Sequence, residues 1–228
     1  MLLSDRNDKK VFITGASRGI GSSIKGVFER NGYSVIAPNR EELALSSDSS
    51  VMSYVQNHNL SDIDIFVHCA GINKLAGISE ISKEILDSVF QVNVFSALSL
   101  IKAMTPGMKS RHFGRLVLIS SLYSLVSRTN RLAYTASKNA LTGVAKNLTL
   151  ELAPFGILTN CVAPGYVMTD MTRKNLSTEE ISKIEKNIPT GRFQSEDEIA
   201  NLVLFLSSEY NQSITGQLIA VDGGFLCN

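Results

Sequence analysis

Short apolar runs alternate with longer helical segments along most of the chain, and this alternation limits the available folds more than any other feature. The runs are rich in Val, Ile and Leu, as expected of parallel strands covered on both faces. The predicted strands cover residues 10–14, 34–37, 63–68, 115–120, 158–163 and 217–221. Between them, apolar residues recur at helical spacing, most clearly in 20–31, 83–110, 133–154 and 196–207. The alternation predicts an α/β fold: a doubly wound, Rossmann-type parallel sheet with helices on both faces.

Length and composition favour one globular domain. The chain has 228 residues, of which 44% are apolar and 19% charged. It contains no repeat and no low-complexity linker, so residues 1–228 are predicted to form a single domain. Segment 165–194 has weak strand signals and is expected to be a flexible substrate flap. The formal net charge of +1 gives no reason to expect nucleic acid or a membrane as partner.

The sequence lacks the marks of export and of metal binding. No apolar run reaches the roughly 18 residues of a membrane span, and the first residues, MLLSDRNDKK, lack the apolar region of a signal peptide. A cytoplasmic location is therefore expected. Cys69, Cys161 and Cys227 lie far apart and in no CxxC pattern. They are interpreted as reduced thiols, and no metal site is expected.

The stretch TGASRGIG, residues 14–21, links the first predicted strand to the first predicted helix. In an open α/β sheet, ligands bind beyond the carboxyl ends of the strands. Gly15 can adopt a backbone conformation that side chains forbid, and Gly19 and Gly21 allow close approach of a ligand. Free N–H groups at the start of the helix can bind a phosphate. A plain glycine-rich turn is the alternative for this motif by itself.

A second pattern suits ketone reduction. Tyr134 and Lys138 lie one helical turn apart and share a face. A nearby ammonium is expected to lower the tyrosine pKa, so that Tyr134 can exchange a proton with an alkoxide. Ser121, thirteen residues before Tyr134, can hydrogen-bond the carbonyl oxygen. The Tyr–Lys pair alone is also typical of a half-buried aromatic ring beside a solvated charge.

Three further motifs accompany these patterns: Asn93 in QVNV, Pro164-Gly165 after a strand, and VDGG near the end of the chain. In this order and spacing, from residue 10 to residue 224, the chain resembles the short-chain dehydrogenase/reductase family. Within the family it resembles the 3-oxoacyl-acyl-carrier-protein reductases. The resemblance implies that a ketone is reduced to a secondary alcohol with a nicotinamide cofactor.

The resemblance also implies roles for single residues. The catalytic residues are expected to be Ser121, Tyr134, Lys138 and Asn93, with Lys138 also binding the nicotinamide ribose and Asn93 holding a water of a proton relay. Asp48 resembles the acidic residue that contacts adenine. The positions expected to bind the cofactor are Gly15, Ser17, Arg18, Gly19, Ile20, Gly21, Asn39, Arg40, Asp48, Ala70, Gly71, Tyr134, Lys138, Pro164, Gly165, Val167 and Thr169.

The end of the second strand indicates which cofactor is used. Members of the family that prefer NAD carry an acidic residue there, whereas this chain has Asn39 and Arg40. No carboxylate is expected to repel a phosphate, and Arg18 supplies a second guanidinium, so the 2′-phosphate of NADP(H) is expected to bind. Ordinary surface charges are the alternative for both arginines.

Two features depart from the family pattern. The family's NNAG sequence reads His68-Cys69-Ala70-Gly71 here, and His68 is interpreted as a structural substitute rather than a catalytic base. Segment 40–48 is too short for a full helix before the next one begins. The adenine side of the site is therefore expected to be more open.

Substrate and partners are less constrained. Tyr123, Tyr166 and Met168 are expected to line the substrate pocket. Arg111 and Arg173 resemble positions that contact an acidic acyl carrier protein, with solvated surface charges as the alternative. A homotetramer or homodimer is expected through segments 83–110 and 133–154 and the C-terminal strand.

Three functions remain open at this point. The first is NADPH-dependent reduction of a 3-oxoacyl thioester, as in fatty acid biosynthesis. The second is the same chemistry on a keto-sugar or another small ketone. The third is a nicotinamide-binding interaction protein without catalysis, which the intact Ser–Tyr–Lys set disfavours.

Overall fold

The computed structural model describes residues 8–175 and 177–227, and in this part of the chain six strands form one parallel sheet. The strand order is β2-β1-β3-β4-β5-β6. The strands are β1 Lys10–Thr14, β2 Ser34–Ile36, β3 Ile65–His68, β4 Gly114–Ile119, β5 Ile157–Pro164 and β6 Leu218–Val221. The predicted doubly wound sheet is confirmed, and the strand ends differ from the predicted ones by at most two residues.

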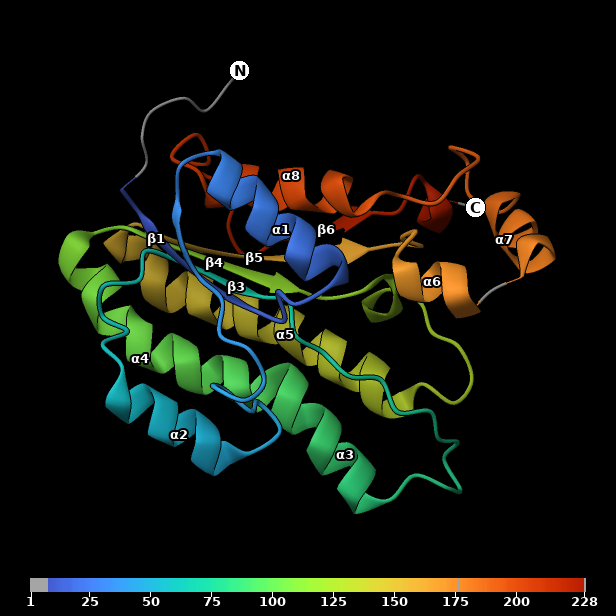
Figure 1. Cartoon of the computed structure of the whole chain (residues 1–228), viewed down its shortest axis with the longest axis horizontal. Coiled ribbons are helices and arrows are strands. Elements are labelled where there is room, and N and C mark those ends of the chain that lie inside the picture. Colours follow the sequence, from blue (N-terminus) through green and yellow to red (C-terminus); the bar gives the residue numbers. More distant parts are fainter. Residues whose placement is uncertain (1–7, 176, 228) are drawn as a thin grey trace.

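Helices cover both faces of the sheet (Figure 1). One face carries α1 (Gly19–Arg30) and α8 (Glu196–Ser207), which pack against each other. The other face carries α4 and α5, with α2 packed outside α4. The remaining bounds are α2 Asp48–Asn57, α3 Lys83–Phe90, α4 Ser96–Arg111, α5 Leu132–Leu152, α6 Asp170–Asn175 and α7 Thr178–Glu185.

The sheet separates two apolar layers because successive side chains of a strand point to opposite faces. In β1, Phe12 belongs to the layer beneath α2, α4 and α5, whereas Val11 and Ile13 belong to the layer beneath α1 and α8. All three side chains are fully buried. This burial on both faces explains why the strands are continuous apolar runs rather than alternating ones.

The predicted helix 83–110 is present, but a π-helical turn, Gln91–Phe95, joins its two parts, α3 and α4. By length and composition, Lys83–Arg111 is the one described helix that could cross a membrane. Its α4 part packs on the sheet instead, with Leu100, Met104 and Met108 fully buried. Lys83–Arg111 is therefore a core helix. Its π-helical turn marks a candidate functional position, since such turns are frequent at functional sites.

The first half of the sheet is short. In the common dinucleotide-binding order, 3-2-1-4-5-6, two strands lie outside the first one, whereas here β2 alone does so within the described residues. Residues 37–47 run from β2 to α2 without forming a further strand or helix. Leu43 of this loop is buried in the core beside Val51 and Tyr54 of α2. The expectation that segment 40–48 is too short for a full helix is confirmed.

The segment 165–194 contains two helices that its weak periodicity did not predict, α6 and α7. Both lie beyond the carboxyl ends of the strands (Figure 1). Helix α7 begins with a capping box. The Ser177 side chain accepts from the N–H of Glu180, and the Glu180 side chain accepts from the N–H of Ser177. The movement of this segment as a flap stays a prediction.

Candidate active site

The predicted catalytic residues converge at the carboxyl ends of β3, β4 and β5. Ser121 follows β4, Tyr134 and Lys138 lie in the first turns of α5, and Asn93 lies in the π-helical turn. The site thus lies beside the point where the sheet order reverses, between β1 and β3. This is where an open α/β sheet binds its ligand.

The glycine loop after β1 is fixed by close backbone contacts. Gly15 has φ +73°, and a Cβ there would lie 2.7 Å from the backbone of Ala70. A Cβ at Gly21 would lie 2.1 Å from the carbonyl oxygen of Gly15. Helix α1 begins without a capping hydrogen bond from the side chain of Arg18 and without an acidic residue in its first turn. The Glu196 carboxylate of α8 lies nearby, 3.7 Å from the position of a Cβ at Gly19. A helix N-terminus of this kind can bind an anion. Of the other predicted loop residues, Ser17, Arg18 and Gly19 lie at this N-terminus, and Ile20 packs against the core.

Ser121 and Tyr134 form the polar centre of the site. Ser121 is 8% exposed, and its hydroxyl accepts from the N–H of Tyr123 at 3.2 Å. Burial raises the pKa of Tyr134, while a hydrogen bond with Ser121 and the charge of Arg131 act in the opposite direction. Tyr134 therefore stays protonated at neutral pH and is ready to donate to an oxygen held by Ser121.

Lys138 is buried beneath this pair. Its Nζ donates to the carbonyl oxygen of Ile119 at 2.7 Å and lies 5.7 Å from the centroid of the Tyr134 ring. Burial lowers the pKa of Lys138 to about 8. The expectation that Tyr134 has a lowered pKa is wrong for this structure: its pKa is raised, because burial of the phenol outweighs the groups that lower it.

Asn93 holds the π-helical turn against the loop after β3. Its side-chain Oδ1 accepts from the N–H of Ile72 at 2.8 Å, and its Nδ2 donates to the carbonyl oxygen of Ile72 and to the hydroxyl of Ser137. A Cβ at Gly71 would lie 3.2 Å from Lys138 Nζ and 3.5 Å from Asn93 Oδ1. Asn93, Gly71 and Lys138 are therefore brought together as predicted.

The end of β2 differs from expectation. The Oδ1 of Asn39 accepts from the N–H groups of Glu41 and Glu42, and the Glu42 carboxylate accepts from the N–H of Asn39 at 2.8 Å. A carboxylate thus does lie at this strand end, and the Asn39 side chain is occupied in forming a turn. The two charged groups expected at the ribose phosphate, Arg18 and Arg40, are both exposed. Asp48, predicted to contact adenine, is exposed in the first turn of α2.

The residues after β5 that were expected to bind the cofactor also make contacts within the protein. Pro164 is the last residue of β5. A Cβ at Gly165 would lie 2.6 Å from the backbone of Asp222 in the VDGG turn. Val167 forms a bridge with Gln194, and the Thr169 hydroxyl accepts from the N–H of Thr172 in α6.

His68 occupies a structural position, in agreement with its interpretation. It is fully buried, and its Nδ1 lies 2.9 Å from the hydroxyl of Thr14. Its Nε2 has no hydrogen-bond partner among the described residues. Burial, followed by the charge of Lys138, lowers the pKa of His68 to about 3. His68 is therefore neutral near pH 7 and is no acid for the reaction.

Aromatic rings surround the substrate side of Tyr134. The Tyr123 ring meets the Tyr134 ring edge to face at a centroid distance of 6.4 Å. Tyr166 packs edge to face against Phe193 and Phe225. Tyr166 also lines a cavity of about 700 Å³. The half-buried Met168 donates its N–H to the carbonyl oxygen of Gln194.

Two arginines of this region were missed by the sequence reasoning. Arg128 hydrogen-bonds Tyr123 and Tyr166, and the Arg131 guanidinium lies 4.9 Å from the centroid of the Tyr123 ring. Both lie in the loop between Ser121 and Tyr134. Two basic residues so close to the catalytic tyrosine in the chain were the signal that could have found them.

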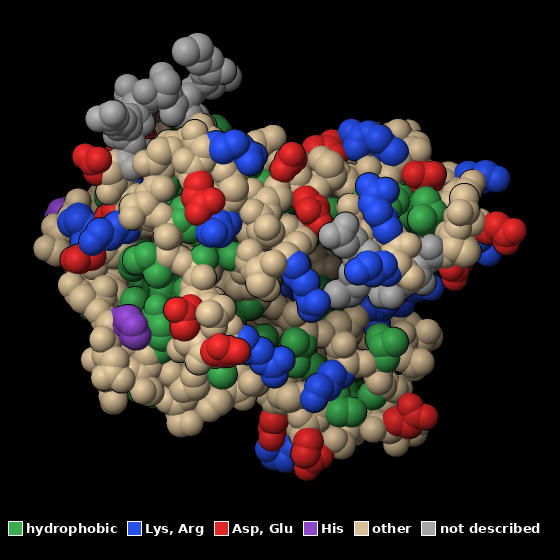
Figure 2. Space-filling view, in the orientation of Figure 1, with side chains coloured by type: hydrophobic (Ala, Val, Ile, Leu, Met, Phe, Trp, Pro, Cys, Tyr) green, Lys and Arg blue, Asp and Glu red, His purple; other side chains and the backbone are tan. Residues whose placement is uncertain are grey.

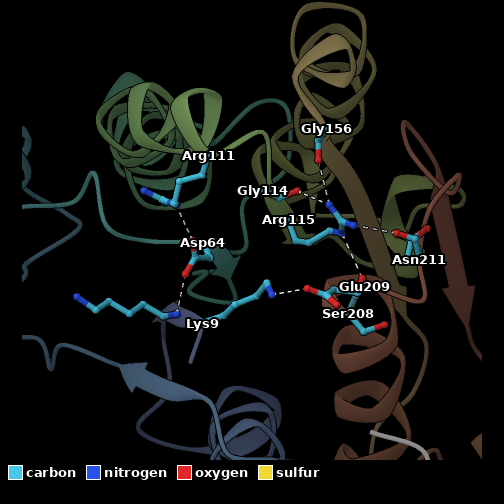
Figure 3. A network of polar contacts seen from close by, with 10 residues as sticks. Lys9, Asp64, Arg111, Gly114, Arg115, Gly156, Ser208, Glu209 and Asn211 are labelled. Atoms are coloured by element: carbon cyan, nitrogen blue, oxygen red, sulfur yellow. Dashed lines mark hydrogen bonds and ion pairs between the residues drawn. The ribbon is translucent and has the colours of Figure 1, made fainter. Parts of the chain in front are cut away.

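Arg111 lies at the amino ends of the strands, away from the catalytic residues, and its role in carrier binding stays a prediction. It pairs with Asp64 at 2.8 Å (Figure 3). It also donates to the carbonyl oxygens of Ser61 and Ile63, before β3 begins. The neighbouring Arg115 is buried there against backbone carbonyl groups (Figure 3). Arg173, the other predicted contact, is exposed on α6 beside the site.

Comparisons with known proteins agree with this geometry. Residues 44–226 match a family model described as Enoyl-(Acyl carrier protein) reductase. The chain is 39% identical to the 3-oxoacyl-(acyl-carrier-protein) reductase of Aquifex aeolicus (strain VF5), over 94% of this chain and 86% of that protein. It is 32% identical to the enzyme of that name from Escherichia coli (strain K12), over 95% and 96%.

Solved structures give the same result. The 3-oxoacyl-(acyl-carrier protein) reductase of Brucella melitensis ATCC 23457 matches with a TM-score of 0.88 and 27% identity, covering 97% of this chain and 93% of that one. A protein assigned as an NAD(P) dependent gluconate 5-dehydrogenase, from Beutenbergia cavernae with bound NADP, matches with a TM-score of 0.88 and 29% identity, covering 96% and 97%. The chain belongs to the short-chain dehydrogenase/reductase family of oxidoreductases, with 3-oxoacyl-(acyl-carrier-protein) reductases among its relatives.

Proposed function

We propose that this protein is an NADPH-dependent reductase of a 3-oxoacyl thioester carried by acyl carrier protein. The observation that carries the proposal is the hydrogen-bonded pair of Ser121 and Tyr134 above the buried ammonium of Lys138. The relatives that match nearly the whole chain bear the corresponding enzyme name.

The residues present fit a dinucleotide cofactor. The uncapped start of α1 suits the pyrophosphate, and the close packing of Gly15 and Gly21 keeps this loop free of side chains where a phosphate would approach. Arg18 and Arg40 are the groups that would bind the 2′-phosphate, and Lys138 and Tyr134 those that would bind the nicotinamide ribose. When bound, the reduced cofactor supplies the hydride for the carbonyl carbon.

The protein's own groups supply the proton. Ser121 orients the carbonyl oxygen toward the phenol, and Tyr134 donates its proton to that oxygen as negative charge develops on it. The Lys138 ammonium beneath the ring stabilises the resulting phenolate. The Asn93 amide, which holds the loop at Ile72, lies beside the Lys138 ammonium, where a water of a proton relay would bind.

The first experiment measures NADPH oxidation with a short 3-oxoacyl thioester by the wild type and by Tyr134→Phe. Loss of the phenolic proton should lower kcat at least about 100-fold, while the Kd for NADPH, followed by its fluorescence, should change less than about threefold. Tyr134→Phe with more than a tenth of the wild-type kcat would show that Tyr134 is not the acid.

Two observations favour specific alternatives. The description of the matching family model names reduction of a carbon–carbon double bond, and one similar structure is assigned to a sugar-acid dehydrogenase. The pairing of Ser121 with Tyr134 around one oxygen favours a carbonyl over an alkene. Parallel assays with a 2-enoyl thioester and with 5-ketogluconate separate the three reactions. Tight NADPH binding without turnover of any ketone would instead support a binding protein.

Location and assembly complete the proposal. We expect a cytoplasmic enzyme that works on carrier-bound substrate, with Arg173 near the carrier. We expect a homo-oligomer, a tetramer or a dimer, through α4, α5 and β6, whose outer surfaces expose apolar residues such as Leu98 and Leu150. Light scattering of the purified protein measures the number of subunits.

A further inference from the structure

A polar cluster at the substrate side has no part in the proton transfer described above. Arg128 and Tyr166 line the same cavity, and the Arg128 guanidinium interacts with the phenols of Tyr123 and Tyr166. The Arg131 guanidinium lies 4.9 Å from the centroid of the Tyr123 ring. Two guanidinium groups and two phenols therefore meet at the end of the catalytic loop.

Arg128 is exposed, and the partners described for its guanidinium are neutral. Its partners are phenols, whereas Arg111 and Arg192 each pair with a carboxylate, Asp64 and Glu198 respectively. Among the side chains described in residues 8–169, 172–174 and 177–227, no carboxylate forms an ion pair with Arg128. A guanidinium has five N–H donors, so two neutral acceptors leave donors available for a ligand. The cluster is therefore a preorganised site for an oxyanion.

The cavity of about 700 Å³ beside this cluster is lined by Arg128 and Tyr166. Its apolar wall consists of Val126, Ile184, Phe225 and Leu226. An aliphatic chain ending in an acidic group matches this combination of apolar wall and basic end.

The other charged groups that line the cavity still leave it suited to an acidic group. Glu180 and Lys183 of α7 both line it. The Glu180 carboxylate accepts from the N–H of Ser177 at 2.8 Å and caps α7. Lys183 adds a second positive charge. Figure 2 shows several further Lys and Arg side chains on the face over α6 and α7.

The position of the cluster relates the anion to the ketone. The Tyr123 ring touches both Arg128 and, edge to face at 6.4 Å, the Tyr134 ring. One aromatic side chain therefore separates the basic site from the proton donor. The phosphate of a pantetheine arm is separated from the thioester by the whole length of that arm, whereas a terminal carboxylate lies only a few bonds from the ketone.

We propose that Arg128, together with the hydroxyl groups of Tyr123 and Tyr166, binds a carboxylate at the far end of the acyl chain, which makes dicarboxylic 3-oxoacyl thioesters the preferred substrates. The proposal rests on the proposed function, because it specifies the substrate of the same site. Arg128 is then a specificity-determining residue.

The test compares two thioesters of N-acetylcysteamine that have the same chain length, 3-oxoadipoyl with a terminal carboxylate and 3-oxohexanoyl without one. The wild type should show a kcat/KM about 10- to 100-fold higher for the dicarboxylic substrate. Arg128→Gln should lose this preference, keep its kcat/KM for 3-oxohexanoyl within about threefold, and bind NADPH normally. Arg128→Lys should retain part of the preference.

The matched control is Lys186→Gln, which also removes one positive charge. Lys186 lies at the end of α7 and does not line the cavity. This variant should keep the full preference. Equal kcat/KM for both substrates in the wild type, or an equal loss for both in Arg128→Gln, would overturn the proposal and leave Arg128 as a brace between two tyrosines. The proposal is also overturned if only a phosphopantetheine thioester of the 3-oxohexanoyl group responds to Arg128→Gln.

Calorimetric binding of the same two thioesters in the presence of NADP⁺ needs no turnover. Tighter binding of 3-oxoadipoyl to the wild type than to Arg128→Gln supports the carboxylate site even if the reduction itself fails, and equal binding overturns it. Failure of both thioesters to be reduced, with this difference in binding intact, would instead refute the proposed reaction.

Discussion

Lys138 places its Nζ 5.7 Å from the centroid of the Tyr134 ring, one helical turn away, while donating to the carbonyl oxygen of Ile119 at 2.7 Å. The ammonium is thus fixed from one side by the end of β4 and lies beneath the proton donor on the other. Because burial lowers its pKa to about 8, its charge is the component of the site that is lost most easily as the pH rises.

This gives a prediction for the pH dependence of reduction. The ammonium form of Lys138 is the active one, so kcat/KM should be constant below about pH 8 and fall above it, approaching tenfold per pH unit. Tyr134 does not limit this range, because its pKa is raised above the ordinary value by burial. The measurement is a profile of kcat/KM from pH 6 to 10.

The control is Lys138→Met, which should have low activity and no decline near pH 8. If kcat/KM of Lys138→Met falls with the same midpoint as in the wild type, the fall is caused by another group.

Gly71 provides a second prediction. A Cβ at this position would lie 3.2 Å from Lys138 Nζ and 3.5 Å from Asn93 Oδ1. Gly71→Ala should therefore displace the ammonium and lower kcat at least about tenfold, since small misplacements of catalytic groups are costly, while the midpoint of thermal unfolding falls by only a few degrees. Activity assays and calorimetry test the two parts.

Gly143→Ala is the matched control in α5, where a Cβ would meet nothing within 4 Å. It should leave kcat unchanged and stabilise the protein by roughly 0.5–1 kcal/mol, as Ala does at a helix interior. Wild-type kcat in Gly71→Ala would show that the ammonium tolerates displacement.

The choice of cofactor gives a third prediction. Replacing Arg18 and Arg40 together by Gln should weaken NADPH binding about 10- to 100-fold and leave NADH binding nearly unchanged, because only NADPH carries the 2′-phosphate. Asn39→Ala, which removes the cap of the turn at Glu41 and Glu42, should instead weaken both cofactors alike. Fluorescence titrations give the four Kd values, and an equal loss for NADH in the double variant would refute the phosphate assignment.

The sequence was sufficient for the features that depend on local pattern. Continuous apolar runs such as Ile157–Pro164 predict a strand covered on both faces, and the i, i+4 spacing of Tyr134 and Lys138 predicts their shared helical face. Gly15 was correctly expected to adopt a conformation that side chains forbid, since its φ is +73°. Tight packing at Gly21 was also expected, and a Cβ there would lie 2.1 Å from the carbonyl oxygen of Gly15. The approach of a ligand to Gly19 and Gly21 stays a prediction.

Features that depend on tertiary contacts could not be predicted in the same way. The sequence does not reveal that α4 ends at the amino edge of the sheet, where the Arg111 guanidinium pairs with Asp64. Asn39 was expected to face the cofactor, yet its side chain caps a local turn. The pKa of Tyr134 depends on how deeply the phenol is buried, which periodicity does not reveal.

The last prediction concerns the stability of the fold and starts from His68. The imidazole is fully buried next to Thr14, and burial followed by the Lys138 charge lowers its pKa to about 3. In the unfolded chain the pKa of histidine is about 6.5, so between about pH 3 and 6.5 the unfolded state binds a proton that the folded state does not. The contribution of His68 to the free energy of unfolding should therefore be fully present above about pH 6.5. Below that pH it should decrease by about 1.4 kcal/mol per pH unit.

His68→Asn removes the titrating group and places there the amide that the family pattern carries. Its free energy of unfolding, measured with urea at pH 7.0 and pH 5.0, should decline less with acidification than that of the wild type. If His68→Asn and the wild type lose the same free energy between the two pH values, the acid sensitivity arises from other groups and His68 is protonated as readily in the folded protein as in the unfolded chain.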